Sequence, residues 1–307
     1  MLKKKLMVLG AAAAACLAFG TLAMADVTVT DMTGREITVS GDVERVVALT
    51  AADCEILYAL DGGDLLVGRG EYCDYPAEVQ EVPSVQSGSD TNIEQIIELK
   101  PQVVLMGTMA QTEEQIASLE NAGIQVVVSD AQDIEGVYTA IDMIGTLIGK
   151  EDEAKKLVED MKAAFKELTV ETPENPETVY FEVSPLEYGL WAAGKGTFMN
   201  EIAEMIGLKN VFDDVEGWAE ISEEQVIERN PDHIVTITMY FGEGPTPAEE
   251  IESRQGWENI TAVKNHSILN LQNNELSRPV PRLVEGAKML YDFVYGDEKA
   301  EETDDAA

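Results

Sequence analysis

Two runs of short apolar segments, each alternating with segments of helical period, are separated in this sequence by one long amphipathic stretch. In the first run, the apolar segments are typical of buried parallel strands. The expected strands are 45–50, 65–68, 102–106 and 125–129, and the expected helices are 52–60, 92–100, 112–122 and 134–148. Repeated strand–helix units of this kind predict a mainly parallel sheet with helices on both faces.

A second run follows the long amphipathic stretch. Its expected strands are 178–183, 233–238 and 267–271, and its expected helices lie near 198–206, 222–230 and 281–295. Within the stretch, Leu157, Met161 and Phe165 fall on one helical stripe, which predicts a single continuous helix. The fold class is therefore α/β, with two lobes that each hold a mainly parallel sheet flanked by helices. One long rigid helix joins the lobes, and a ligand cleft is expected between them.

These patterns divide the 307 residues into five parts. A β-hairpin is expected over 26–43, because apolar and polar residues alternate around Gly34. The tail is acidic and poor in apolar residues, so we expect it to be disordered. The parts are a signal peptide (1–25), an N-terminal α/β lobe (26–149), a connecting helix (150–172), a C-terminal α/β lobe (173–296) and a disordered tail (297–307).

The N-terminus has the pattern of an export signal. Three lysines precede an apolar run over 6–22, and Ala23-Met24-Ala25 then fits the small-x-small cleavage rule. Ala13-Ala14-Ala15-Cys16 loosely resembles a lipoprotein cleavage site, although the usual leucine three residues before the cysteine is absent. Either form of processing exports the protein to the outer face of the cell membrane, and Cys16 is a candidate for lipidation.

Charge and rare residues exclude several kinds of function. The formal net charge of −37 would repel phosphate backbones and anionic lipid heads, which argues against nucleic-acid binding and against direct membrane binding other than through a lipid anchor. Two histidines cannot build a zinc site of several imidazoles, and no metal site is expected. The segment 189–197 nearly matches a phosphate-binding loop, but Gly196 stands where Ser or Thr must hold magnesium.

The remaining cysteines, Cys54 and Cys73, are too few for a disulfide scaffold. An exported protein can meet an oxidising compartment, so the two could pair. We favour two separate, partly buried thiols.

Aromatic residues are few, and their positions are informative. Six apolar side chains fall just after expected strands or in the loops between them, where a side chain faces a cleft, faces solvent or caps the core. They are Tyr72, Trp191, Trp218, Tyr240, Phe241 and Leu276.

Several segments, taken in order, resemble one family of binding proteins. They are 45–49, 53–60, 72–76, 92–101, 194–198, 218–222, 230–232 and 276–282. Together they are similar to the periplasmic binding proteins for cobalamin, ferric siderophores and haem, over essentially the whole mature chain. The resemblance implies a non-enzymatic, monomeric protein that needs no catalytic cofactor. It would capture a small-molecule ligand between its lobes and deliver it to an ABC permease driven by an ATPase.

Within that family, the cobalamin-binding branch is the most similar. The resemblance implies that Tyr72 and Trp218 pack on a corrin ring and that Trp191 and Leu276 make further apolar contacts. Arg278 would meet amide or carboxylate groups of the ligand. Glu94 and Glu224 match the two glutamates through which the family docks on arginines of the permease.

The resemblance leaves the ligand open. Gly88 and Gly107 stand where a cobalamin binder has tryptophans, so the ligand could also be a corrinoid precursor, haem or a ferric siderophore. Haem would need an axial ligand, for which Tyr72, Met106, Met109 and His266 are candidates. An exported hydrolase, and a sensor or adhesin that meets no permease, are the alternatives from other classes.

Overall fold

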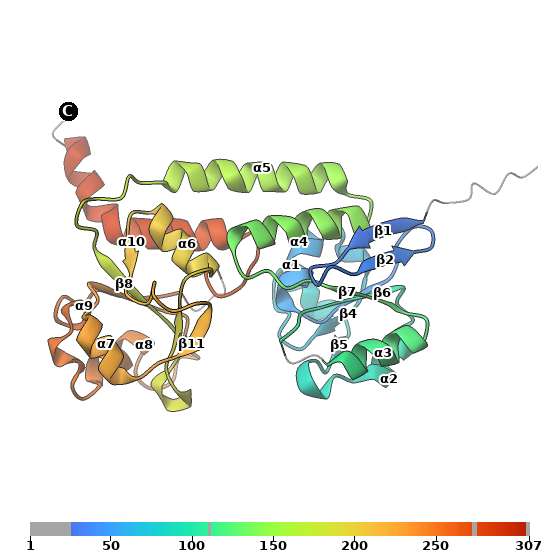
Figure 1. Cartoon of the computed structure of the whole chain (residues 1–307), viewed down its shortest axis with the longest axis horizontal. Helices are drawn as coiled ribbons and strands as arrows, with labels where there is room; N and C mark the ends of the chain where they lie inside the picture. The colour runs from blue at the N-terminus through green and yellow to red at the C-terminus, as the bar shows by residue number, and fades with distance from the viewer. Residues whose placement is uncertain (1–25, 110–111, 272–274, 305–307) are drawn as a thin grey trace, which may run out of the picture.

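The computed structural model describes residues 26–109, 112–271 and 275–304, with side chains to residue 296, and arranges them as two α/β lobes beneath one long helix (Figure 1). The expected signal peptide and Cys16 lie outside the described residues. Within the described ranges, none of the helices has the length and apolar character that crossing a bilayer requires.

The first lobe is built on a five-stranded sheet with the strand order β5-β4-β3-β6-β7, in which every neighbouring pair is parallel. The strands are β3 (Val46–Ala48), β4 (Leu66–Gly70), β5 (Ser84–Val85), β6 (Val103–Met106) and β7 (Gln125–Val128). Every residue of β3 and β6 is buried, because helices cover both faces of the sheet. That burial explains why these strands read as unbroken apolar runs.

Four helices and a hairpin complete this lobe. They are β1 (Val27–Thr30), β2 (Glu36–Val39), α1 (Ala51–Ala59), α2 (Ile93–Leu99), α3 (Glu113–Asn121) and α4 (Ile134–Leu147). The expected hairpin is confirmed, since β1 and β2 pair antiparallel. Residues of α1 and α4 pack with Val46 and Leu105 on one face of the sheet, whereas residues of α2 and α3 pack with Val47 and Val104 on the other.

The second lobe has a mixed sheet with the order β11-β9-β8-β12-β13, and β10 also pairs with β8. The strands are β8 (Thr178–Ser184), β9 (Trp191–Ala193), β10 (Lys209–Asn210), β11 (Trp218–Glu220), β12 (His233–Thr236) and β13 (Ile268–Asn270). The helices are α6 (Phe198–Met205), α7 (Glu223–Arg229), α8 (Pro247–Ser253), α9 (Thr261–Lys264) and α10 (Leu283–Asp304). β9 and β11 join antiparallel, so this sheet is less parallel than expected. Both are three residues long, too short to show a period in sequence.

The two lobes share a broad joint. The long helix α5 (Glu151–Leu168) buries Ala154, Val158, Met161 and Phe165 and packs on α4 of the first lobe and on α10 of the second. Beneath it, apolar residues of both lobes form one continuous core cluster. Two hydrogen bonds also cross between the lobes at the start of α4 and α6: Phe198 N–H to the Gln132 carbonyl (2.9 Å) and Ile134 N–H to Glu201 Oε2 (2.8 Å).

At the C-terminal end, α10 is described as far as Asp304. The composition predicts disorder from residue 297 onward, and that stays a prediction. Glu298, Lys299, Ala300 and Glu301 are strong helix formers, and a helix that is already nucleated by packing extends through such residues at little cost. Residues 305–307 lie outside the described residues.

Candidate functional site

Large apolar side chains are exposed at the same end of both sheets. Parallel strands present their carboxyl ends at one edge, which is where open α/β sheets bind ligands. At this edge the exposed residues are Tyr72 and Tyr75 after β4, Met109 after β6, Tyr188 after β8, Trp191 at the start of β9, and Met239 and Phe241 after β12. We call these residues the exposed apolar set. Exposing so many large apolar groups in loops is unfavourable in water unless a partner covers them.

Trp191 and Trp218 project from one face of a short ribbon. In the antiparallel pair β9–β11, Trp218 lies opposite Ala193 and Trp191 lies opposite Glu220. Residues two positions apart on a strand share a face, so the two indoles are diagonal neighbours about 7–8 Å apart at the backbone. The structure thus brings together two residues that the sequence analysis placed in separate loops.

The ring of Trp218 is held where the lobes meet. It packs against the buried ring of Phe198, with ring centroids 5.4 Å apart. Its indole N–H donates to Oε1 of Gln132, which belongs to the first lobe, at 2.9 Å. The sequence analysis did not identify Gln132 and Phe198 as site residues. Gln132 is not aromatic, Phe198 is buried, and neither belongs to a charged motif. Only the proximity of a loop to α6 reveals them.

Tyr72 lies on the first lobe with 77% of its surface exposed. Its backbone carbonyl accepts a hydrogen bond from Arg278 Nη2 (3.1 Å), and the same guanidinium pairs with Asp74 Oδ1 (2.6 Å). Arg278 was expected to meet the ligand. In this structure its guanidinium binds the loop that carries Tyr72, and a contact between Arg278 and the ligand stays a prediction.

Leu276 does not belong to the exposed apolar set. Its side chain is fully buried in the core, although we expected a ligand contact there. The reason is the close approach of the chain to α10: a Cβ on Gly286 would lie 2.6 Å from the Glu275 carbonyl oxygen. Leu276 belongs to the same core cluster as Leu283 and Ala287 of α10.

Tyr240 and Phe241 lie together in the segment after β12. The hydroxyl of half-buried Tyr240 donates to the Gly244 carbonyl (3.2 Å), which closes a tight loop. Phe241 in that loop is 82% exposed. The loop therefore presents Phe241 and Met239 to solvent.

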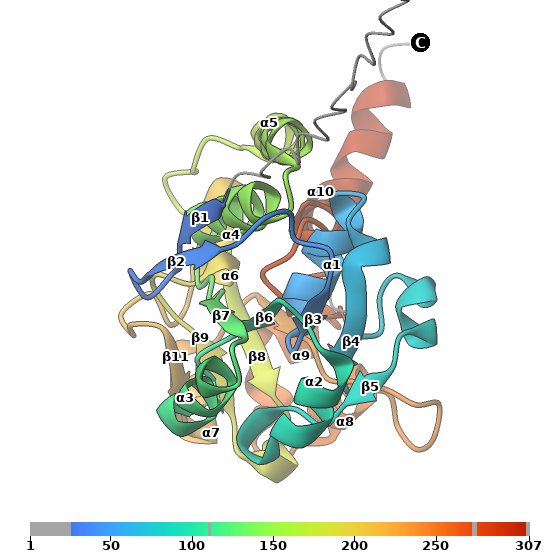
Figure 2. The ribbon, with the colours of Figure 1, turned by 90° about the vertical axis from the view of Figure 1, so that its right-hand side faces the viewer.

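Two short helices at the lower side of Figure 1 carry Glu94 and Glu224. α2 begins after the N-cap Asn92 and α7 after the N-cap Ser222, and each helix ends at a left-handed residue, Lys100 or Asn230. The two helices share an exposed glutamate and an exposed isoleucine three residues later, Ile97 or Ile227. Figure 2 confirms that both helices lie on the side of the molecule away from α5.

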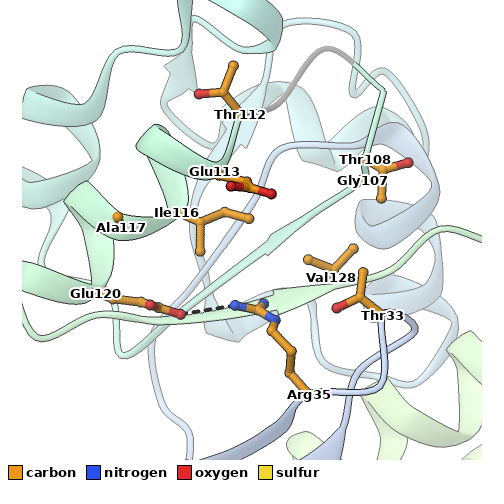
Figure 3. A pocket seen from close by; sticks show the side chains of 10 residues that line it. All are labelled: Thr33, Arg35, Gly107, Thr108, Thr112, Glu113, Ile116, Ala117, Glu120 and Val128. Atoms are coloured by element: carbon orange, nitrogen blue, oxygen red, sulfur yellow. Dashed lines mark hydrogen bonds and ion pairs between the residues drawn. The ribbon is translucent and has the colours of Figure 1, made fainter.

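Two of the cavities formed by the described residues have volumes of about 460 Å³ each. One lies within the first lobe between β7, α3 and the β1–β2 turn (Figure 3), where Arg35 pairs with Asp31 at 2.8 Å and with Glu120 at 3.1 Å. The other lies between α1 and the start of α10. Neither is lined by Tyr72, Trp191 or Trp218, so these three rings lie outside both cavities.

Among the described residues, no group of three or more His, Cys, Asp or Glu side chains is placed to hold a metal ion. His233 hydrogen-bonds to Ser267 (2.7 Å) and Glu177 (3.0 Å), and His266 hydrogen-bonds to Glu252 (2.7 Å). Cys54 and Cys73 are free, fully buried thiols that both point toward the Ala48 carbonyl. The hydrogen bond with Cys73 and burial raise the pKa of Cys54, which disfavours the reactive thiolate.

A buried carboxyl group lies at the carboxyl edge of the first sheet. Asp53 accepts a hydrogen bond from Thr50 Oγ1 (2.6 Å) at Oδ2, while Oδ1 has no hydrogen-bond partner. Burial raises the pKa of Asp53 from 3.8 to about 6; hydrogen bonds from Thr50 and Ser129 oppose this, and the charge of Asp130 adds to it.

We expect Asp53→Asn to gain stability over the parent as the pH rises. Below about pH 4 the carboxyl group is protonated in the folded state, whereas above pH 6 the fold must hold a buried charge. The advantage of the variant should grow by up to about 3 kcal/mol in free energy of unfolding. Urea unfolding at several pH values measures it. Asp142→Asn on the exposed face of α4 is the control, and a pH-independent gain for Asp53→Asn would contradict the expectation.

The sequence matches the family described as "Periplasmic binding protein" over residues 46–275. The Bacillus subtilis "Uncharacterized ABC transporter substrate-binding lipoprotein YvrC" is 36% identical over 278 residues, 88% of this chain and 86% of that protein. The "Vitamin B12-binding protein" of Salmonella paratyphi A is 27% identical over 250 residues, 80% of this chain and 88% of that protein. A solved structure from Staphylococcus epidermidis, described as a possible iron-binding (periplasmic solute-binding) protein, is 34% identical with a TM-score of 0.68. It covers 83% of this chain and 99% of its own.

Proposed function

Because this chain belongs to the periplasmic binding protein family and is the solute-binding component of an ABC importer, we propose that its cargo is a corrinoid such as cobalamin. It acts without catalysing a reaction and needs no catalytic cofactor. It works as an exported monomer, divided at α5 into two lobes. A permease driven by an ATPase receives the cargo, and the N-terminus is either cleaved or lipidated at Cys16.

The observation that carries the proposal is the pair of indoles on one face of β9–β11, with Trp218 fixed to Gln132 of the opposite lobe. A large conjugated ring gains dispersion and desolvation energy against such flat faces. Tyr72 supplies a ring from the first lobe. The loop after β12 supplies the ring of Phe241 and the half-buried ring of Tyr240. Similarity to vitamin B12-binding proteins supports the choice of ring.

A second candidate cargo is an iron chelate, either a ferric siderophore or haem. The similarity to a protein described as possibly binding iron favours it. For haem, Met106 is fully buried in the core and cannot reach a ligand in this conformation, whereas Tyr72 and Met109 are highly exposed. His266 is held by Glu252. Calorimetric titration with cobalamin, haem and a ferric siderophore distinguishes the cargoes, and haem binding with a shifted Soret band but no cobalamin affinity would overturn the corrinoid proposal.

We expect Trp218→Ala to weaken affinity for the cargo by about 30-fold or more, the effect of losing a central aromatic contact. Gln132→Ala keeps the ring but removes its hydrogen bond, so its effect should be smaller. Met289→Ala truncates an exposed apolar side chain on α10, remote from the carboxyl edge, and serves as the matched control. Titration calorimetry measures all three. Equal affinity of Trp218→Ala and parent would remove Trp218 from the site.

We also propose that Glu94 and Glu224 dock the protein on the permease. Both are exposed on helices of the same build, and each is followed by an exposed isoleucine that can add apolar contact. Matched charges on two lobes would fix the register of a two-point contact. A sensor or adhesin would have no use for this arrangement.

A further inference from the structure

Two arginines of the second lobe converge on one buried glutamate of the first. Glu55 lies on α1, and only 2% of its side chain is exposed. Arg282, next to the start of α10, donates from Nε to Oε2 (2.8 Å) and from Nη2 to Oε1 (2.9 Å). Arg278 Nη1 donates to Oε1 as well, at 3.2 Å. The carboxylate is thus held by three charge-assisted hydrogen bonds that all cross between the lobes.

The cluster continues into the loop that carries Tyr72. Arg278 binds Asp74 and the Tyr72 carbonyl, and the Arg282 guanidinium stacks on the ring of Tyr75, 3.8 Å from its centroid. The guanidinium of Arg278 therefore contacts both α1 and the loop after β4. Any rotation of the second lobe would move this loop or break these hydrogen bonds.

At this point charge-assisted hydrogen bonds add to the apolar packing that the two lobes share. One of the 460 Å³ cavities lies beside the cluster, lined by Glu55, Tyr58, Tyr75 and Arg282 among others. A rigid, bidentate guanidinium–carboxylate pair fixes orientation as well as distance. A buried carboxylate that loses its cations is strongly unfavourable, so the paired arrangement is selected over displaced ones.

We infer that Glu55 is a positioning residue for ligand capture, which fixes the mutual orientation of the lobes and, through Arg278, seats the loop that presents Tyr72. The predicted effect of Glu55 on ligand affinity rests on the proposed function. The effect on lobe orientation needs no ligand and is tested separately.

The test uses the Glu55→Gln variant with nitroxide labels on introduced cysteines at Ser118 of α3 and Glu228 of α7. Both positions are exposed, whereas Cys54 and Cys73 are buried. Pulsed electron resonance should show one narrow distance distribution in the parent and a broader one in Glu55→Gln. If the competent arrangement falls to about a tenth of the population, the apparent Kd of the cargo rises about tenfold.

Glu182→Gln is the matched control. Glu182 is as buried as Glu55 and is also held by an arginine through two hydrogen bonds, but both partners belong to the second lobe. Its loss should lower stability without widening the interlobe distances. If Glu55→Gln does not fold, Arg278→Gln, at a less buried position, serves as the test variant. It should also broaden the distribution of interlobe distances.

Distances that stay narrow in both Glu55→Gln and Arg278→Gln, or that widen equally in Glu182→Gln, would overturn the inference. So would widened distances with unchanged affinity for a cargo that the parent binds. A parent that binds no member of the ligand panel would instead refute the proposed cargo, while the distance measurement would still decide the role of Glu55.

Discussion

Reversing the charges of Glu94 and Glu224 together is expected to reduce cargo uptake to the level seen without the binding protein, while leaving cargo affinity unchanged. Each glutamate would face a cation on the permease, and a reversed charge there turns an attraction into a repulsion of several kcal/mol. Both side chains lie in the first turns of α2 and α7, helices on the side of the molecule away from α5 (Figures 1 and 2). Neither glutamate belongs to the exposed apolar set, so we expect ligand capture to be unaffected.

The measurement is uptake of labelled cargo into proteoliposomes that contain the permease and its ATPase. Glu94→Lys/Glu224→Lys should fail, and the single variants should fall between it and the parent. Glu159→Lys/Glu167→Lys makes the same change in net charge on the exposed face of α5, at the opposite side of the molecule. If this control lowers uptake equally, overall charge rather than docking explains the loss. Full uptake by the first double variant would refute docking through these residues.

Replacing Arg254 by methionine is expected to lower the free energy of unfolding by about 3–5 kcal/mol. Arg254 donates two hydrogen bonds to Glu182, at 2.6 and 3.0 Å, and both side chains are almost completely buried. It also binds Glu250 and lies over the ring of Trp257. Without the guanidinium, Glu182 would remain as a buried carboxyl group whose pKa burial already raises.

Urea unfolding at neutral pH measures this loss. Arg229→Met is the matched control, because Arg229 also stacks on a ring, Phe212, and pairs with an acid, Asp214, but at the surface. An exposed pair contributes about 0–1 kcal/mol, so the control should lose much less. The double variant Glu182→Met/Arg254→Met should recover most of the stability, since it leaves no unpaired charge. Equal losses at Arg254 and Arg229 would contradict this account.

The regular elements were predictable because their signals are local. Asn92 caps α2 as expected, and the apolar stripe of α5 was visible as Met161 and Phe165 on one face. The unbroken apolar runs of β3 and β6 report burial on both faces. Each of these features depends on residues within a few positions of one another.

Features that depend on distant residues were not predictable. Glu182 is 72 positions from Arg254, and Glu55 is 227 positions from Arg282, so no spacing in the sequence indicates either pair. In a chain with 58 acidic residues, a partnered glutamate looks like any other. The burial of Leu276 depends on Gly286 admitting the backbone of Glu275, which is likewise a contact between segments. The position of Trp218 against Gln132 required the same three-dimensional information.

The broad joint beneath α5 has a consequence for how a transporter selects its receptor. Because the lobes share one apolar core and several hydrogen bonds, we expect them to keep nearly the same outline with and without cargo. Under the proposed docking through α2 and α7, the permease could then not reject an empty receptor by its shape. Empty copies would compete with loaded ones for each docking position, and surplus unloaded receptor would inhibit import.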